Sequence, residues 1–257
     1  MTAFAELIAR RDLLFNLTHA ELTARYRSAA LGLLWFVLTP LVLMVVLTIV
    51  FEYVIDLGIP DYPVFVLSAL LPFTYIQVAL LNTSTSISRS PGLIKRAHMP
   101  RIFLPLAAIG SNLVHFVISL VLLLPLMVAM GVPLTPALLL LPLAIALAVA
   151  VVTGAGLLSA ALNVAHRDVE LILSAGTRVL FYLSPIFYPL SAVPEPWQPF
   201  YCLNPVVGVI EMHRALLLDG TLPPSWLIGI TVGSTAVLLA VGIIVFVRRQ
   251  PDFEDYL

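Results

Sequence analysis

Residues 102–130 read IFLPLAAIGSNLVHFVISLVLLLPLMVAM, an apolar run without a single Asp, Glu, Lys or Arg. A helix needs about 20 such residues to cross a hydrocarbon core of roughly 30 Å. Within a bilayer the backbone must satisfy its own hydrogen bonds, and a helix does so inside one segment. This stretch therefore predicts a transmembrane helix.

The composition extends this prediction to the whole chain. Of 257 residues, 61% are hydrophobic and 11% are charged, whereas about a quarter are charged in a soluble domain. The mean hydropathy is +1.06. These values exclude a soluble globular enzyme and a disordered chain. An outer-membrane barrel would instead alternate apolar and polar residues over about 10 positions. The net charge of -1 gives no indication of a nucleic-acid partner.

Similar apolar runs predict an all-α polytopic membrane protein with six transmembrane helices. The predicted spans are approximately 33–55, 62–82, 102–130, 134–162, 170–189 and 226–247.

The basic residues predict the orientation, because Lys and Arg concentrate in cytoplasmic loops. Arg214 falls outside if the N-terminus is cytoplasmic, and Arg178 lies within the fifth span. We therefore expect both termini on the cytoplasmic side of the cytoplasmic (inner) membrane. The other basic residues then all fall inside: Arg10, Arg11, Arg25, Arg27, Arg89, Lys95, Arg96, Arg101, Arg167, Arg248 and Arg249.

Residues 1–30 contain neither Gly nor Pro, and apolar residues such as Phe4, Leu7 and Phe15 fall near one helical face. This pattern indicates an amphipathic helix on the inner membrane surface. The alternative is an ordinary soluble N-terminal helix.

Residues 190–225 are rich in proline and in aromatic residues. They are too apolar for a free loop and too interrupted for a span. Asn204 followed by Pro205 is typical of a helix start, so a helix is predicted from 205 to about 218. Short re-entrant helices on the external side would fit, provided that protein or a water-filled cavity covers their irregular backbone.

The sequence contains few residues that could bind a nucleotide or a metal or catalyse a reaction. The only lysine, Lys95, follows Ile94, so the chain lacks a phosphate-binding loop of the Gly-Lys-Ser/Thr kind. The histidines are scattered without a metal-binding pair, and Cys202 is the only cysteine. We therefore expect no catalytic residues, metal or cofactor on this chain. It would move a substrate rather than convert it, with any power supplied by a partner.

The loop between the second and third spans, residues 88–101, allows two interpretations. Pro91-Gly92 and Pro100 bracket about two helical turns that mix apolar and basic residues. A short amphipathic helix of this kind can dock into a groove on a soluble subunit. Alternatively, it is a basic loop that sets topology and contacts anionic lipid.

Arg178 lies about eight residues into the fifth span, where a cation at the membrane centre costs about 2.5–3.5 kcal/mol. It could contact an anionic group on a passing substrate. It could also snorkel to the inner surface or form an ion pair with Asp168 or Glu170.

Aromatic residues cluster near span ends, where they form membrane-interface belts. The belt interpretation is preferred for the earlier pairs, Trp35/Phe36, Phe51/Tyr53 and Phe73/Tyr75. Later aromatic residues could form a belt or line a passage for sugar rings, whose apolar faces suit aromatic side chains. These are Phe181, Tyr182, Phe187, Tyr188, Trp197, Phe200 and Tyr201.

Four strings, in register along nearly the whole chain, resemble ABC-type permeases that export polysaccharides such as O-antigen or teichoic acid. Residues 25–35, RYRSAALGLLW, resemble the entry motif of that family, and residues 88–106, ending in PRIFLPL, resemble its coupling loop. Residues 162–169, LNVAHRDV, resemble the loop between spans four and five, which contains Arg167 and Asp168. Residues 183–189, LSPIFYP, resemble the beginning of the family's C-terminal region, after span five.

The resemblance implies one exporter domain over 1–257. Its parts are an interfacial helix (1–30), a coupling loop (84–101) and an external gate segment (184–218). It implies a homodimer with two copies of a soluble ATP-binding subunit, which would hold ATP and Mg, and a lipid-linked polysaccharide as substrate.

The resemblance also implies residue roles. Substrate entry would involve Arg25, Tyr26, Arg27 and Arg178. The channel and gate would involve Phe181, Tyr182, Phe187, Tyr188, Trp197 and Tyr201. Coupling to the ATPase would involve Ser88, Arg89, Leu93, Ile94, Lys95, Arg96, His98 and Met99.

Two positions depart from the family pattern. Ala29 stands where a Ser or Thr is expected, and Arg178 stands where a neutral polar residue is expected. The expected function is the transmembrane subunit of an ATP-driven exporter of lipid-linked polysaccharide. The alternatives are an ABC exporter of drugs or small lipids and an ATP-independent lipid flippase.

Overall fold

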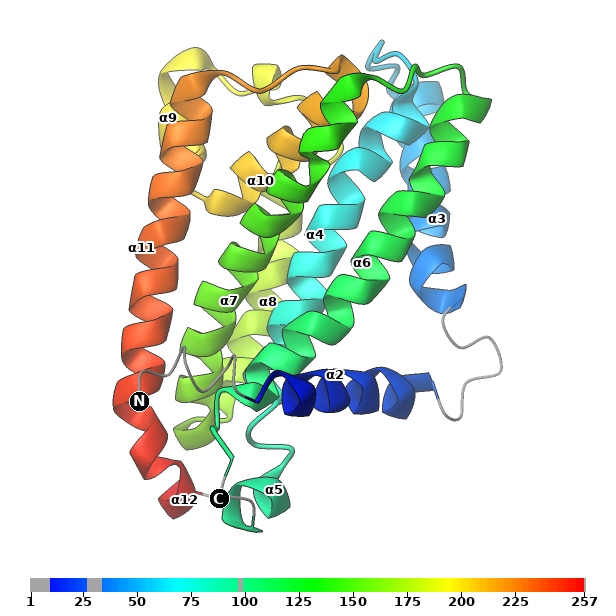
Figure 1. Cartoon of the computed structure of the whole chain (residues 1–257). Coiled ribbons are helices and arrows are strands. Elements are labelled where there is room, and N and C mark those ends of the chain that lie inside the picture. The colour runs from blue at the N-terminus through cyan, green and yellow to red at the C-terminus, as the bar shows by residue number, and fades with distance from the viewer. Residues whose placement is uncertain (1–9, 27–33, 97–98, 257) are drawn as a thin grey trace.

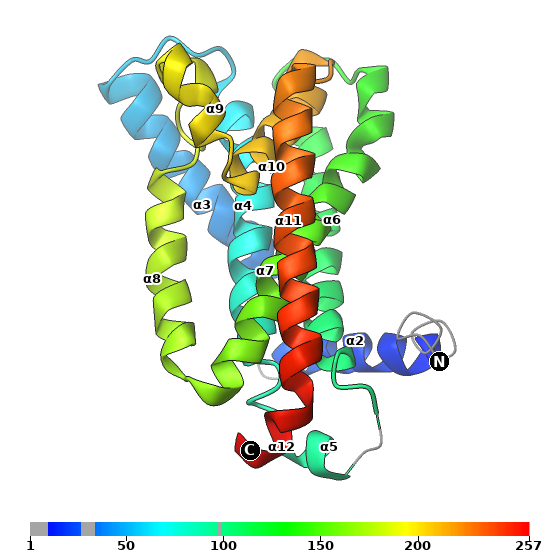
Figure 2. The ribbon, with the colours of Figure 1, turned by 90° about the vertical axis from the view of Figure 1, so that its left-hand side faces the viewer.

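The computed structural model describes residues 10–26, 34–96 and 99–256, and every regular element in these ranges is helical. The long helices run side by side in one bundle (Figures 1 and 2). Short helices occupy both ends of the bundle: α9 and α10 lie at one end, and α5 and α12 lie at the other. We call these the α10 end and the α5 end.

The helices of the bundle are α3 (Leu34–Thr48), α4 (Tyr62–Thr85), α6 (Phe103–Ala129), α7 (Leu141–Ala165), α8 (Asp168–Tyr182) and α11 (Ser225–Arg249). The shorter helices are α2 (Arg11–Tyr26), α5 (Pro91–Arg96), α9 (Gln198–Tyr201), α10 (Pro205–Arg214) and α12 (Phe253–Tyr256). π-Helical turns η1 (Ile49–Val54) and η5 (Ala215–Asp219) extend α3 and α10. The 3₁₀ turns are η2 (Pro136–Leu140), η3 (Leu190–Ala192), η4 (Glu195–Trp197) and η6 (Gln250–Asp252).

α4 is the centre of the bundle. It packs against α3, α6, α7, α8 and α10, and it is buried along most of its length. Its residues Val64, Val66, Ala69 and Ala79 have no exposed surface. The helices α3, α6, α7 and α8 bury one face against it, whereas α11 packs on α7 and α10. These long helices leave apolar residues exposed on their outer faces, as expected for helices that meet lipid or a second subunit.

Four helical segments of the described chain are long and apolar enough to cross a membrane. They correspond to the second, third, fourth and sixth predicted spans: Tyr62–Thr85, Phe103–Ala129, Pro136–Ala165 and Ser225–Asp252. The all-helical, multi-pass membrane architecture is thus confirmed, whereas the count of six spans stays a prediction. The first predicted span matches α3 and η1, of which Leu38–Val54 is a shorter apolar helix.

The fifth predicted span is shorter than expected. The sequence predicted 170–189, but α8 ends at Tyr182 and irregular backbone follows to Pro189. Pro185 explains the early end, because the residue before a proline is disfavoured in the helical conformation and proline lacks the amide hydrogen that a helix interior needs.

α2 runs across the bundle rather than along it, near the α5 end (Figure 1). It packs on the start of α6: a Cβ atom on Gly110 would lie 3.2 Å from the methyl carbon of Thr18. Phe15 on its outer side is 72% exposed. This crosswise course suits the predicted interfacial helix, whose position on a membrane stays a prediction. Residues 1–9 of the predicted 1–30 helix lie outside the described residues.

Candidate functional site

The segment between α8 and α11 stays at the α10 end. In Figure 2, α9 and α10 lie beside the upper parts of α8 and α11, and neither reaches the opposite end. α10 starts as predicted: the side chain of Asn204 accepts a hydrogen bond from the backbone N–H of Val206 (3.1 Å), with Pro205 at the first helical position. The chain continues through η5 to Gly220, which closes the turn with a φ of +63°. The segment therefore starts and ends at the same end of the bundle, as a re-entrant course requires, whereas its depth in a membrane and its external side stay predictions.

Arg214 ends α10 with a buried ion pair. Its Nη1 donates to Oε1 of Glu211 at 2.6 Å, and these side chains are only 6% and 16% exposed. Its Nη2 donates to the carbonyl oxygens of Pro185 (2.7 Å) and Ile186 (3.3 Å). Its guanidinium carbon lies 3.9 Å from the ring centre of Phe65 on α4. One side chain thus ties α10, α4 and the connection after α8 together. We call this set the α10 brace.

Burial acts on both charges of the brace. It raises the pKa of Glu211, an effect that the neighbouring Arg214 opposes. Burial also lowers the pKa of Arg214, and Glu211 counteracts that shift. Each charge therefore offsets part of the desolvation cost of the other, so removal of either one leaves an uncompensated buried charge.

An aromatic cluster adjoins the brace. The ring of Phe187 lies 5.1 Å from that of Phe51 on η1 and 6.0 Å from that of Phe181 on α8. Phe181 also meets Phe73 of α4 edge-on at 5.5 Å. Tyr182 packs edge-on against Phe181 at 5.3 Å and is 67% exposed. The cluster thus joins three helices and presents aromatic surface at its edge.

Two tyrosines extend this cluster to the short helix α9. The hydroxyl groups of Tyr188 and Tyr201 are 2.7 Å apart. The Tyr188 hydroxyl also donates to the carbonyl oxygen of Tyr182 (3.2 Å). Five of the six predicted channel residues therefore form one continuous group. Trp197 is the exception: it packs against Phe200 at 6.1 Å and is 65% exposed.

The membrane-belt interpretation is wrong for one early aromatic pair. Phe73 and Tyr75 are each 2% exposed. Tyr75 stacks on Phe116 of α6 at 4.8 Å, deep between helices. Both residues lie in the middle of α4 rather than at a span end, and α4 is surrounded by other helices, so these rings face protein rather than the membrane surface. The sequence also gave no sign that Phe51 meets Phe187, which lies far away along the chain.

The α5 end brings two predicted loops together. The side-chain amide of Asn163 on α7 donates to the hydroxyl of Ser88 (3.3 Å). Arg89 pairs with Glu170 of α8 at 3.5 Å, both side chains being substantially exposed. The coupling loop and the loop that contains Arg167 and Asp168 are thus in direct contact.

α5 itself confirms a short helix between Pro91 and Arg96. Its two apolar residues differ in burial: Leu93 is 43% exposed, whereas Ile94 is 6% exposed. Ile94 packs into a cluster with Phe246 and Phe253 of the same chain. Leu93 is therefore the more accessible apolar residue of α5, and the coupling roles of both residues stay predictions.

The ABC-2 type transporter family matches residues 12–218. This range covers both the coupling loop and the re-entrant helix α10. The chain belongs to the ABC-2 type transporter family.

Curated relatives of this family member extend over almost the whole chain. It is 30% identical over 252 residues to the O-antigen export system permease protein RfbA of Myxococcus xanthus, covering 97% of each chain. It is 29% identical over 249 residues to the protein of the same name from Klebsiella pneumoniae, covering 96% of this chain and 95% of the other. It is 25% identical over 234 residues to the polysialic acid transport protein KpsM of Escherichia coli, covering 90% of each.

The predicted entry residues are only partly described in this ABC-2 protein. Arg25 and Tyr26 form the end of α2, without described side chains, and Arg27 lies outside the described residues. Arg178 lies exposed on α8, and no ion pair of the described side chains includes it. Glu170, one of its predicted alternative partners, pairs with Arg89 instead.

The remaining coupling residues have varied surroundings. Met99 is half-buried and Arg89 is exposed. Lys95 and Arg96 lie on α5, without described side chains, and His98 lies outside the described residues. Arg167 and Asp168 are exposed at the start of α8.

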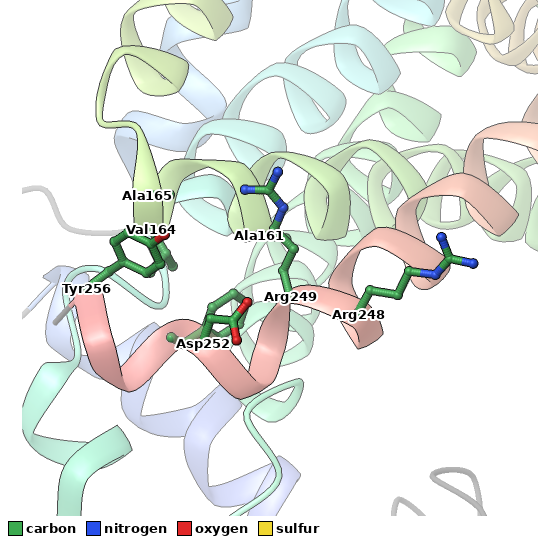
Figure 3. A pocket seen from close by; sticks show the side chains of 8 residues that line it. Ala161, Val164, Ala165, Arg248, Arg249, Asp252 and Tyr256 are labelled. Carbon is green, nitrogen blue, oxygen red and sulfur yellow. The ribbon is translucent and has the colours of Figure 1, made fainter.

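The α5 end also contains a pocket of about 410 Å³ that the sequence gave no reason to expect. Figure 3 shows Arg249 extending along α7, Arg248 pointing away, and Tyr256 lying over Val164. Small residues of α7 and the chain's last turns form its walls. The lining residues are Ala161, Val164, Ala165, Arg248, Arg249, Asp252, Phe253 and Tyr256. No group of three His, Cys, Asp or Glu residues able to hold a metal occurs among the described residues.

Proposed function

We propose that this ABC-2 chain is the transmembrane subunit of an ATP-driven exporter of a lipid-linked cell-surface polysaccharide. The observation that supports this most is similarity along 97% of the chain to a permease named for O-antigen export. The proposal places the chain in the cytoplasmic (inner) membrane with both termini cytoplasmic. It works there as a homodimer with two soluble ATP-binding subunits, which hold ATP and Mg.

The aromatic cluster supports a sugar substrate. Tyr182 offers an exposed ring, and the rings of Phe181 and Phe187 lie close behind it. Aromatic rings bind the apolar faces of sugars without demanding one hydroxyl pattern, which suits a polymer that must keep sliding. The α10 end would be the external gate, which the brace at Arg214 holds in position.

The α5 end supports coupling to a partner. α5 projects beyond the long helices (Figure 1), and its exposed Leu93 and its basic residues provide a docking face. ATP-driven movement of α5 would shift the helices that line the passage. The lipid-linked end of the substrate would enter near Arg25, Tyr26 and Arg27, with Arg178 contacting its anionic group.

The test is the location of long glycan after depletion of this protein in its native cell. Surface and intracellular polysaccharide are compared by fractionation and sugar analysis, with the wild-type gene restored as control. Polymer trapped inside and missing outside supports the proposal and identifies the substrate. Unchanged surface glycan contradicts it and favours an exporter of drugs or small lipids.

A second measurement addresses the energy source. The tagged chain is purified in mild detergent and its co-purified proteins are identified. An ATP-binding subunit in the complex supports the ABC mechanism. Purification without any such subunit, from cells whose glycan export depends on this chain, favours an ATP-independent flippase.

A further inference from the structure

The C-terminal turns hold the coupling helix through a charged contact. After α5, the chain reaches Arg101, whose Nη1 donates to the carbonyl oxygen of Gln250. Its Nη2 donates to Oε1 of Glu254, with which it forms an ion pair. The fork of one guanidinium therefore joins the end of the coupling loop to both η6 and α12. We call this contact the C-terminal clamp.

Apolar packing reinforces the clamp. Ile94 of α5, Phe246 of α11 and Phe253 of α12 belong to one buried cluster. The rings of Phe246 and Phe253 meet edge-on at 5.5 Å, and each is at most 1% exposed. α5 therefore shares a buried cluster with the ends of α11 and α12, in addition to its loop connections to α4 and α6.

α11 is in turn fixed to α7 by direct backbone contact. A Cβ atom on Gly154 would lie 2.7 Å from the backbone nitrogen of Leu239, and one on Gly242 would overlap the carbonyl oxygen of Gly154. Such a glycine contact leaves no flexible side chain between the two helices. A displacement of α5 thus has a path through α12 and α11 to α7, of which the α11–α7 step is a direct backbone contact.

We propose that residues Gln250–Tyr256 complete the docking surface for the ATP-binding subunit and transmit the movement of α5 to α11. This inference rests on the proposed function. α5 alone is only six residues long and is bounded by loops that would absorb much of a push, whereas the clamp and the cluster around Ile94 give this region a second attachment.

The surface charge favours a protein as the occupant. α5 carries Lys95 and Arg96, and the adjoining C-terminal turns carry exposed Asp252 and Glu254. Adjacent opposite charges set the register of a protein partner. Arg248 and Arg249 lie beside Asp252 on the same face, and such a mixture of both charge signs suits a protein partner better than a uniformly anionic membrane surface.

A charge exchange across the clamp tests the proposal. Arg101→Glu, Glu254→Arg and the double exchange are expressed in cells depleted of the native chain. Surface glycan, membrane content of the chain, co-purified ATP-binding subunit and ATP hydrolysis by the purified complex are measured for each. Each single variant is expected to lower surface glycan per ATP hydrolysed by a factor of about five, as for the loss of one partly exposed pair. The double exchange is expected to recover at least about half of that loss, because only the ion pair and not the bond to Gln250 is restored.

Two further variants separate coupling from folding. Glu254→Gln alters a side chain that is 54% exposed, so the fold is retained while the pair is lost. It is expected to lower the glycan-to-ATP ratio at normal membrane content. Arg248→Glu, a charge reversal on a neighbouring exposed residue outside the clamp, is expected to leave that ratio unchanged.

The outcomes distinguish this inference from the proposed function. The clamp proposal is overturned if Arg101→Glu or Glu254→Gln exports as much glycan per ATP hydrolysed as the wild type. It is also overturned if the double exchange recovers nothing relative to the single variants. In both cases export by the wild-type chain, and with it the proposed function, still stands. Failure of the restored wild-type chain itself to export glycan overturns both.

Discussion

The two ends of the bundle each depend on an arginine–glutamate pair, in opposite surroundings. In the α10 brace, Arg214 and Glu211 are 6% and 16% exposed and the guanidinium also contacts two carbonyl oxygens and a ring. In the C-terminal clamp, Arg101 and Glu254 are 22% and 54% exposed. The same chemical pair is therefore rigid at one end and adjustable at the other.

Solvent accounts for this difference. A buried pair that loses one partner leaves a charge without water or counter-charge, which costs about 3–5 kcal/mol. A partly exposed pair that breaks is rehydrated, and it contributes about 0–1 kcal/mol. The brace therefore holds one arrangement of the α10 end, whereas the clamp can break and re-form at a lower cost.

The largest expected effect comes from breaking the brace. Arg214→Ala removes the only described ion-pair partner of buried Glu211 and should lower the free energy of unfolding by about 3–5 kcal/mol. Thermal unfolding of the purified protein in detergent measures the change. Arg248→Ala, an exposed arginine on α11, is the control and should change stability by less than about 0.5 kcal/mol. Equal unfolding temperatures for the two variants would show that the brace does not stabilise the α10 end.

The second prediction concerns the connection between the two ends. Gly242→Ala places a methyl group against the carbonyl oxygen of Gly154, so α7 and α11 must separate. A loss of about 1–3 kcal/mol is expected, as for other overpacked cores. Gly233→Ala, on the same helix with nothing within 4 Å of the added carbon, is the matched control. If both variants unfold alike, the helices are not in backbone contact at this point.

The third prediction concerns an uncharged contact at the α10 end, which we compare with the charged brace. Tyr188→Phe removes the hydroxyl that lies 2.7 Å from that of Tyr201. The expected loss is about 0.5–1.5 kcal/mol, less than for the charged brace. Tyr201→Phe and the double variant complete a double-mutant cycle. If the double variant loses as much free energy of unfolding as the two single variants together, the hydroxyl groups do not interact. Tyr53→Phe, which changes a ring that is 75% exposed, is the control.

The smallest stability effect is expected at the clamp. Glu254→Gln should lower the free energy of unfolding by no more than about 1 kcal/mol, because over half of that side chain meets water. The residual effect should shrink further at high salt, which screens exposed pairs. Thermal unfolding at low and high ionic strength measures both. A loss as large as that of Arg214→Ala would remove the distinction between the two ends.

Local patterns predicted the elements of this fold well. Continuous apolar runs located the four long spans, and Asn204 with Pro205 located the start of α10, since capping depends on neighbouring residues only. The proline brackets of the coupling loop located α5. The fifth span was extended too far because its apolar character continues through a proline-interrupted segment.

The sequence patterns did not predict the side-chain contacts between different helices of the bundle. Arg214 was assigned to the external side, but its partners on α4 and after α8 were not visible. The aromatic residues at the end of α8 and after it were assigned to one passage, a role that stays a prediction, and the part that Phe51 and Phe73 play in their cluster was missed. The packing of Ile94 against the C-terminal turns was also missed.

The sequence by itself determined that this chain crosses a membrane, where most of its long helices lie, and which family motifs it carries. Hydrophobicity and capping are properties of neighbouring residues, so they can be read along the chain. Only the tertiary structure decided which of two similar arginine–glutamate pairs is sealed from water. Burial depends on every element packed around a residue, and burial sets the difference between a fixed brace and a movable clamp.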